Sequence, residues 1–306
     1  MPEGDVCYAS AMADKPRIAI VGAGNLGSAL AVSLRQADYK IDAVLARSGG
    51  GSSRRARALA RKVGAKVLVD SLGSLRADVI WFCVPDGEIS RAAGEFMARA
   101  KWSPAEWKRK VALHSSGVLL SDELSALRRR GAVAASMHPL MTFVRGSRPG
   151  LRGVPFAIEG DVGAVRVARG IVRELGGDAY VIRKTDKAAY HAWGTFASPL
   201  LTALLATTER VAGLAGVKGK SARKRMMPIL LQTLENYANR RPEDAFSGPI
   251  IRGDVDTVRR HLRVLRELPA AREVYVALAR AAVQYLPAKN RIALRRVLRS
   301  ARIAEE

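Results

Sequence analysis

Three glycines near the start of the chain could bind the phosphates of a nucleotide. Gly22, Gly24 and Gly27 are spaced G-x-G-x-x-G, directly after the apolar run 18–21 and before a helical pattern rich in alanine and leucine. The first glycine of such a motif permits a sharp strand-to-helix turn, the second lets the backbone approach a pyrophosphate, and the third lets helix and strand pack closely. The free N–H groups of the helix then attract phosphate, although a purely structural glycine turn is the alternative. The predicted cofactor-binding residues here are Gly22, Gly24, Asn25, Leu26 and Gly27.

The next candidates follow the second predicted strand, about 20 residues beyond Gly27. Folds that bind NAD place an acidic residue there, whereas this chain has Arg47 and Ser48. A guanidinium and a hydroxyl suit a 2′-phosphate, and no carboxylate is present to repel it. The sequence therefore favours NADP over NAD. Arg54 and Arg55 follow closely, and the alternative for them is that they only form the solvated face of the next helix.

Three polar turns follow the ends of predicted strands, at residues 84–86, 114–117 and 138–140. Open α/β sheets bind ligands at the carboxyl ends of their strands. A hydroxyl there can hold the nicotinamide carboxamide or a substrate carboxylate, and a histidine can protonate the atom left negative by hydride transfer. We assign cofactor contacts to Val84, Pro85 and Ser116, substrate contacts to Ser115 and His138, and proton transfer to His114. The alternatives are a buried, backbone-bonded turn residue for His114 and a rigid His-Pro turn for His138.

A long helical pattern in the second half opens with Lys187, Tyr190 and His191. Lys187 and His191 are four residues apart and therefore share a helix face. A proton donor on this face could point across an interdomain cleft at the nicotinamide, so both residues are catalytic candidates. The alternative is an ordinary solvated first turn.

The segment 248–254 is the last candidate. Asp254 can cap the helix that carries Val258 and Leu262. Arg252, just before this cap, could hold a carboxylate with two hydrogen bonds, and we assign it to substrate binding. The alternative is that glycine and proline simply turn the chain between two helices.

These residues require a sheet to bring them together. Strands are predicted at 18–21, 41–46, 65–69, 77–85, 110–117, 132–137, 155–160 and 179–182, with helical patterns between them, including one capped at Ser121 that stops at Gly131. Such alternation predicts an α/β fold with a doubly wound, mostly parallel Rossmann sheet. From residue 185 long helical periodicity replaces the strand signals. We expect a disordered extension at 1–14, a dinucleotide-binding domain at 15–183 and an all-helical domain at 184–306.

Composition narrows the classes of function. Among 306 residues, 51 basic and 28 acidic side chains give a net charge of +23, which suggests a nucleic-acid partner. The arginines are spread along the chain and only 6% of residues are aromatic, which favours a solvated basic surface and no nucleic-acid binding. Cys7 and Cys83 show no metal spacing, so we expect no metal site. With no apolar signal segment or membrane-length run, we expect a reducing, cytoplasmic location and no membrane partner.

The motifs together resemble Rossmann-like NADP-dependent oxidoreductases that carry a C-terminal helical domain of unknown function. The resemblance rests on the glycine motif, on residues 84–86, 114–117, 138–140, 190–192 and 248–254, and covers nearly all of 16–286. It departs at Ser198-Pro199, where the family pattern suggests Ser-Asn. The family is similar to pyrroline-5-carboxylate reductases, 3-hydroxyacid dehydrogenases, ketopantoate reductases and prephenate dehydrogenases. The resemblance implies a substrate between the sheet edge and the first helices of the second domain, and a homodimer formed through that domain.

The sequence thus favours an NADP-dependent reductase or dehydrogenase acting on a small anionic carbonyl, hydroxy or imino compound. A non-catalytic NADP-binding sensor or scaffold is the alternative, because a fold alone does not show turnover.

Overall fold

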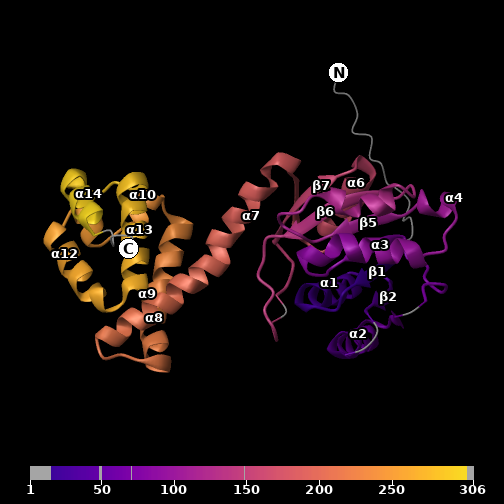
Figure 1. The fold of residues 1–306 in the computed structure, drawn as a ribbon, viewed down its shortest axis with the longest axis horizontal. Helices are drawn as coiled ribbons and strands as arrows, with labels where there is room; N and C mark the ends of the chain where they lie inside the picture. Colours follow the sequence, from indigo (N-terminus) through magenta and orange to yellow (C-terminus); the bar gives the residue numbers. More distant parts are fainter. Residues whose placement is uncertain (1–14, 48–49, 70, 148, 302–306) are drawn as a thin grey trace, which may run out of the picture. The chain divides into compact units, whose positions relative to one another are not determined.

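The computed structural model describes residues 15–47, 50–69, 71–147 and 149–301, which form two compact units divided between Thr195 and Phe196 (Figure 1). The predicted N-terminal extension and Ser48 lie outside the described residues. The helix that opens with Lys187 groups with the sheet in unit 1, residues 1–195.

Unit 1 is built on one eight-stranded sheet in the order β3-β2-β1-β4-β5-β6-β7-β8. Neighbouring strands are parallel except β6 and β7, which are antiparallel, so the predicted mostly parallel α/β sheet is confirmed. The chain winds outward through β1, β2 and β3 and then returns to β4 beside β1, which creates the switch point where such sheets bind ligands. The strands are β1 (Ile18–Val21), β2 (Ile41–Leu45), β3 (Lys66–Leu68), β4 (Val79–Phe82), β5 (Val111–His114), β6 (Val133–Pro139), β7 (Pro155–Gly160) and β8 (Asp178–Val181).

Helices cover both faces of the sheet, which is why its central strands are almost wholly apolar. Ile18 and Ile20 of β1 face one buried cluster, and Ala19 between them faces the other. The first cluster includes residues of α1 (Asn25–Gln36), α2 (Gly50–Val63) and α6 (Val162–Glu174). The second includes residues of α3 (Ile89–Arg99), α4 (Pro104–Trp107) and α5 (Ser125–Arg128). The remaining helical segments of unit 1 are η1 (Asp86–Glu88), η2 (Ser121–Leu124), η3 (Lys184–Asp186) and α7 (Lys187–Thr195).

The prediction of one continuous helix from Ser121 to Gly131 is wrong. The segment folds as the short pieces η2 and α5, and the Ser121 hydroxyl does not cap a helix. It donates instead to the Glu159 carboxylate at 2.9 Å, because a buried carboxylate is a stronger acceptor than the alternatives nearby.

Unit 2, residues 196–306, has only helices among its described residues. They are a π-helical segment (Phe196–Leu200), α8 (Leu201–Leu214), α9 (Gly219–Asn239), α10 (Pro242–Ala245), α11 (Pro249–Arg252), α12 (Val255–Val264), η5 (Leu265–Glu267), α13 (Pro269–Tyr285) and α14 (Arg291–Ser300). The helical periodicity that begins at residue 185 and runs through Leu214 corresponds to α7, the π-helical segment and α8; the π-helical segment contains Pro199, which cannot donate the helical hydrogen bond. The predicted cap is confirmed, since the Asp254 carboxylate accepts from the Thr257 N–H at 3.0 Å.

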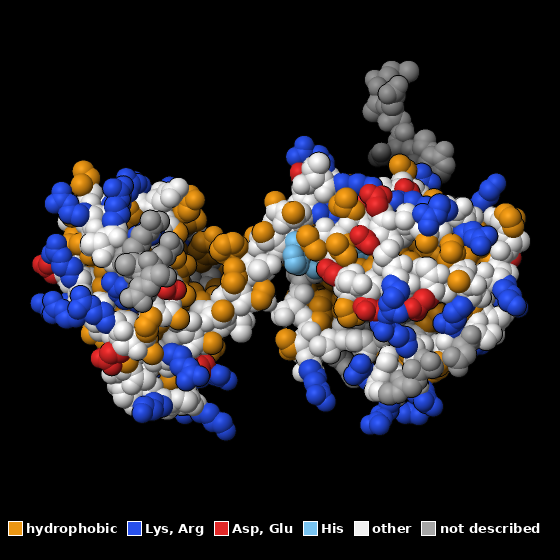
Figure 2. Space-filling model, in the orientation of Figure 1, with side chains coloured by type: hydrophobic (Ala, Val, Ile, Leu, Met, Phe, Trp, Pro, Cys, Tyr) orange, Lys and Arg blue, Asp and Glu red, His pale blue; other side chains and the backbone are white. Residues whose placement is uncertain are grey.

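On the face shown in Figure 2, lysine and arginine side chains are spread over both units, with carboxylates among them. Within the described part of the chain no single helix is long and apolar enough to cross a membrane, and only the bent pair Lys184–Leu214 and Gly219–Asn239 meets that test jointly.

Candidate functional site

The glycine turn between β1 and α1 has the geometry that phosphate binding requires. Gly22 has a φ of +105°, which side chains rarely adopt, and a Cβ there would lie 2.7 Å from the Cys83 carbonyl oxygen. A Cβ on Gly27 would lie 2.2 Å from the Gly22 carbonyl oxygen, so both positions must be glycine. A Cβ on Gly24 would meet no atom within 4 Å. Packing thus explains the outer glycines, and the middle one leaves open space beside the start of α1.

A cavity of about 560 Å³ opens at this turn. The ends of β1, β2 and β4 and the helices α2 and α3 line it, through residues that include Gly22, Gly24, Arg47, Arg55, Val84 and Pro85. The side chain of Arg47 is exposed and pairs with Glu88, which also pairs with Arg91. These two guanidiniums hold the pKa of the Glu88 carboxyl below its usual range. The Arg47 guanidinium therefore reaches the cavity, but it has a carboxylate partner there.

Asn25 and Leu26 have their side chains engaged elsewhere. The Asn25 amide donates to the Phe143 carbonyl at 3.1 Å, and Leu26 packs against the core. Any contact of these two residues with phosphate would therefore involve the backbone N–H groups of the first turn of α1.

The turn after β5 is fixed to the turn after β4. The Ser116 hydroxyl donates to the Asp86 carboxylate at 2.8 Å and accepts from the N–H groups of Val118 and Leu119. Its neighbour Ser115 accepts a hydrogen bond of 2.8 Å from the Trp81 indole. Both hydroxyls are buried and engaged, so the assignments of Ser116 to cofactor and Ser115 to substrate stay predictions.

His114 has both ring nitrogens bonded to the backbone. Nδ1 accepts from the Ser116 N–H at 3.1 Å, and Nε2 donates to the Leu120 carbonyl at 3.0 Å. The side chain is fully buried, and burial, followed by the charge of Lys187, lowers its pKa to about 4. Of the two alternatives that the sequence leaves open, the geometry favours the backbone-bonded turn residue.

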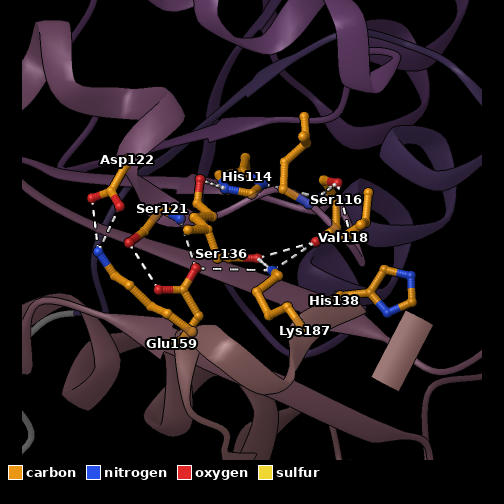
Figure 3. Close-up of polar contacts among 12 residues, drawn as sticks. His114, Ser116, Val118, Ser121, Asp122, Ser136, His138, Glu159 and Lys187 are labelled. Carbon is orange, nitrogen blue, oxygen red and sulfur yellow. Dashed lines mark hydrogen bonds and ion pairs between the residues drawn. The ribbon is translucent and has the colours of Figure 1, made fainter. Parts of the chain in front are cut away.

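Lys187 enters the same region from α7 and is only 2% exposed. Its ammonium donates to the Ser116 carbonyl at 3.0 Å and to the Ser136 hydroxyl, and it lies 3.9 Å from the Glu159 carboxylate. Figure 3 shows the three partners, which belong to the β5 turn, β6 and β7, around the lysine. Burial lowers the pKa of Lys187 to about 8, against the opposing effects of Glu159 and Asp86. The ammonium thus joins α7 to three segments of the sheet edge.

Two histidines and a tyrosine form a second cluster at this edge. His138 Nδ1 is 2.7 Å from the Tyr190 hydroxyl, and the rings of His138 and His191 are 6.2 Å apart. A Cβ added to Gly117 would lie 2.5 Å from His191 Cδ2 and 3.0 Å from His138 Nε2, so both rings lie against this glycine. Burial, followed by the charge of Lys187, lowers the pKa of His138 to about 4, whereas the His191 side chain is partly exposed. The cluster therefore combines a neutral imidazole, a phenol and an accessible imidazole within unit 1.

Arg252 belongs to unit 2, where its side chain is exposed at the end of α11. Its assignment to substrate binding stays a prediction.

Sequence reasoning missed the buried acceptors of the site. Glu159 is 3% exposed and accepts from both the N–H and the hydroxyl of Ser121, and Ser136 is fully buried beside Lys187. A single carboxylate inside the apolar strand 155–160 was the available signal, since a buried charge requires a partner. The partner itself could not be identified without the pairing of β6 with β7.

The two buried histidines predict a stability that falls in mild acid. Their pKa values near 4 lie below the unfolded value of about 6.5, so the unfolded chain binds more protons between these limits. The contribution of these neutral imidazoles to the free energy of unfolding is therefore fully present above about pH 6.5. It is lost as the pH falls towards 4, by about 1–3 kcal/mol for each histidine. All four tryptophans lie in unit 1, at 81, 102, 107 and 193, so urea unfolding followed by tryptophan fluorescence measures this unit.

His138→Gln should flatten that pH dependence, whereas His261→Gln in unit 2 serves as a matched control. If the His138 variant keeps the wild-type dependence of stability on pH, the loss of stability in acid does not come from protonation of His138.

Comparison with known proteins identifies two domain families. Residues 7–139 match the Rossmann-like domain, and residues 154–282 match a domain of unknown function, DUF2520. The predicted resemblance is thereby confirmed. Among curated protein sequences, none matches the chain.

Solved structures share the fold. A protein described as a putative NADP oxidoreductase from Bacteroides fragilis matches with a TM-score of 0.71 and 20% identity over 87% of this chain and 97% of its own. Protein TM1727 from Thermotoga maritima matches with a TM-score of 0.66 and 24% identity over 94% of this chain and 100% of its own. The reductive aminase from Aspergillus terreus, in complex with NADPH and ethyl-5-oxohexanoate, matches with a TM-score of 0.61 and 15% identity over 93% of this chain and 100% of its own.

Proposed function

We propose that this chain, a Rossmann-like domain joined to a domain of unknown function, is a cytoplasmic NADP(H)-dependent oxidoreductase. It transfers a hydride between nicotinamide and a small anionic carbonyl, hydroxy or imino compound. The observation that carries the proposal is the occurrence, at one sheet edge, of a phosphate-type glycine turn with a basic cavity and a cluster of histidines. The oxidoreductases of similar fold support it, since their names include NADP or NADPH.

The residues at the cavity fit a dinucleotide. The space at Gly24 and the first N–H groups of α1 would hold the pyrophosphate, and Arg47 with Arg55 would hold the 2′-phosphate. Val84 and Pro85 line the cavity at the end of β4, and the Ser116 turn lies beside them through its bond to Asp86. When bound, the cofactor supplies or accepts the hydride.

The remaining residues divide the proton chemistry. His138 is neutral at pH 7, so it serves as a hydrogen-bonding group towards substrate and not as a proton donor. His191 is partly exposed beside it and moves the proton. His114 and Lys187, both buried and hydrogen-bonded, act as positioning residues that hold the 114–117 turn, and Arg252 remains the proposed carboxylate-binding residue.

NADP selectivity gives a direct test. Arg47→Asp should weaken NADPH binding tenfold or more, because a charge-assisted bond contributes about 1.5–3 kcal/mol and the new carboxylate repels the 2′-phosphate. NADH binding should change little. Both cofactors must be titrated by fluorescence, since the V8 variant of an imine reductase from Myxococcus stipitatus, of related fold, was solved with NAD+.

Arg35→Asp, at the other end of α1, makes the same change of charge at an exposed position and is the matched control. Equal affinity of the wild type for NADH and NADPH would contradict the selectivity.

We also propose that the protein forms a homodimer through unit 2. Met227, Leu231 and Leu234 repeat at helical spacing along α9 and are 39%, 58% and 55% exposed. A continuous apolar stripe of this kind marks an interface. Light scattering at micromolar concentration should give twice the chain mass of 33.0 kDa.

Leu234→Glu should give monomers, and Gln232→Glu, which adds the same charge beside the stripe, should not. A monomeric wild type would contradict the dimer.

A further inference from the structure

A second cavity adjoins the first at the glycine turn. It has a volume of about 580 Å³, and Gly24, Gly51 and Arg55 line both cavities. Its other lining residues are Asn25, Arg54 and Arg145. Arg145 lies far from the glycine motif in the sequence, on the connection between β6 and β7.

This connection is fastened to the start of α1. The Asn25 amide donates to the carbonyl of Phe143, and the Phe143 side chain packs partly against the core. Arg145 follows two residues later, so the tether holds its guanidinium within reach of the glycine turn. Because β7 runs antiparallel to β6, the connection between them turns back at the carboxyl end of β6, the sheet edge at which the parallel strand β1 also ends.

The second cavity is strongly positive. Three guanidiniums line it, and within the described part of the chain none of them is within ion-pair distance of a carboxylate. Arg47, in the first cavity, is paired with Glu88. The first turn of α1 contains no acidic residue, so its N–H groups add to the positive potential. Mutual repulsion among these groups is relieved by an anion bound between them.

The linings of the two cavities separate Arg145 from Arg47. Arg145 lines only the cavity that Asn25 shares, at the turn where this fold binds a pyrophosphate. Arg47 lines only the cavity at the end of β2, where the ribose of a dinucleotide lies. We infer that Arg145 binds the pyrophosphate of the cofactor, as a clamp supplied by the β6–β7 connection. This inference rests on the proposed function.

The test compares two cofactors that share the pyrophosphate and differ in the 2′-phosphate. NADPH and NADH are titrated by fluorescence against the full-length wild type, Arg145→Ala, Arg47→Ala and Arg152→Ala. Arg152 is an exposed arginine of the same connection that does not line the cavity, so its variant controls for lost charge. Arg145→Ala should weaken both cofactors by about tenfold, Arg47→Ala should weaken mainly NADPH, and Arg152→Ala neither.

The outcomes separate this inference from the proposed function. If the wild type binds a dinucleotide but Arg145→Ala leaves both affinities unchanged, or weakens NADPH alone, the clamp is overturned and the oxidoreductase proposal stands. If the folded wild type binds neither NADPH nor NADH, the proposed function fails together with the clamp. Urea unfolding followed by tryptophan fluorescence verifies that each variant is folded.

Discussion

Lys187→Met should destabilise unit 1 by about 3–5 kcal/mol, because removal of one partner leaves the other charge buried alone. The Glu159 carboxylate is 3% exposed, lies 3.9 Å from the Lys187 ammonium and accepts its hydrogen bonds from Ser121. The Ser116 carbonyl and the Ser136 hydroxyl would also lose their ammonium donor. Urea unfolding at pH 7, followed by tryptophan fluorescence, measures the loss.

The double variant Lys187→Met with Glu159→Gln makes this prediction sharper. Burial lowers the pKa of Lys187 despite the nearby carboxylates, so desolvation of the ammonium outweighs their attraction. Replacing both charges by neutral groups of similar size should therefore recover about 2 kcal/mol or more relative to Lys187→Met. If the loss of stability in the double variant equals the sum of the losses in Lys187→Met and Glu159→Gln alone, the charges of Lys187 and Glu159 do not interact.

The fold could be predicted from the sequence because its signals are local. Gly22 needs a positive φ, Gly27 lies against the strand backbone, and β4 is buried at every position, so each constraint appears directly in the residue types. The same local reasoning gave the cap at Asp254. The periodicity alone did not indicate the π-helical segment at Pro199, where the backbone loses one hydrogen-bond donor.

The candidate site was harder to predict because its contacts depend on register. The antiparallel pairing of β6 and β7 places Ser136 opposite Glu159, and only then can one ammonium from α7 contact both. The pairing of Arg47 with Glu88 likewise joins the ends of two non-consecutive segments. Neither contact leaves a spacing pattern in the sequence, whereas the strand-end positions of His114 and His138 do.

His191→Ala should lower turnover by about 10²–10⁴-fold, the usual contribution of a positioned general acid, once a substrate is identified. NADPH binding should stay nearly unchanged, because His191 does not line the cavity at the glycine turn. The measurement is NADPH oxidation across a panel of small keto acids and imines, with His261→Ala in unit 2 as the matched control. Wild-type binding of NADPH without turnover of any compound in a broad panel would favour the non-catalytic sensor.

Gly117→Ala tests the same role without removing the imidazole. The added methyl group would lie 2.5 Å from His191 Cδ2, so the ring must move away from the 114–117 turn. If His191 delivers a proton from its position beside His138, this displacement should lower kcat strongly and leave NADPH affinity nearly intact, since misplacement of a catalytic group by about 1 Å can cost 10²-fold. Full activity in both variants would exclude His191 as the proton donor. Because His114 has both ring nitrogens bonded to the backbone and His138 is neutral at pH 7, the role would then pass to the Tyr190 phenol, whose hydroxyl is 2.7 Å from His138 Nδ1.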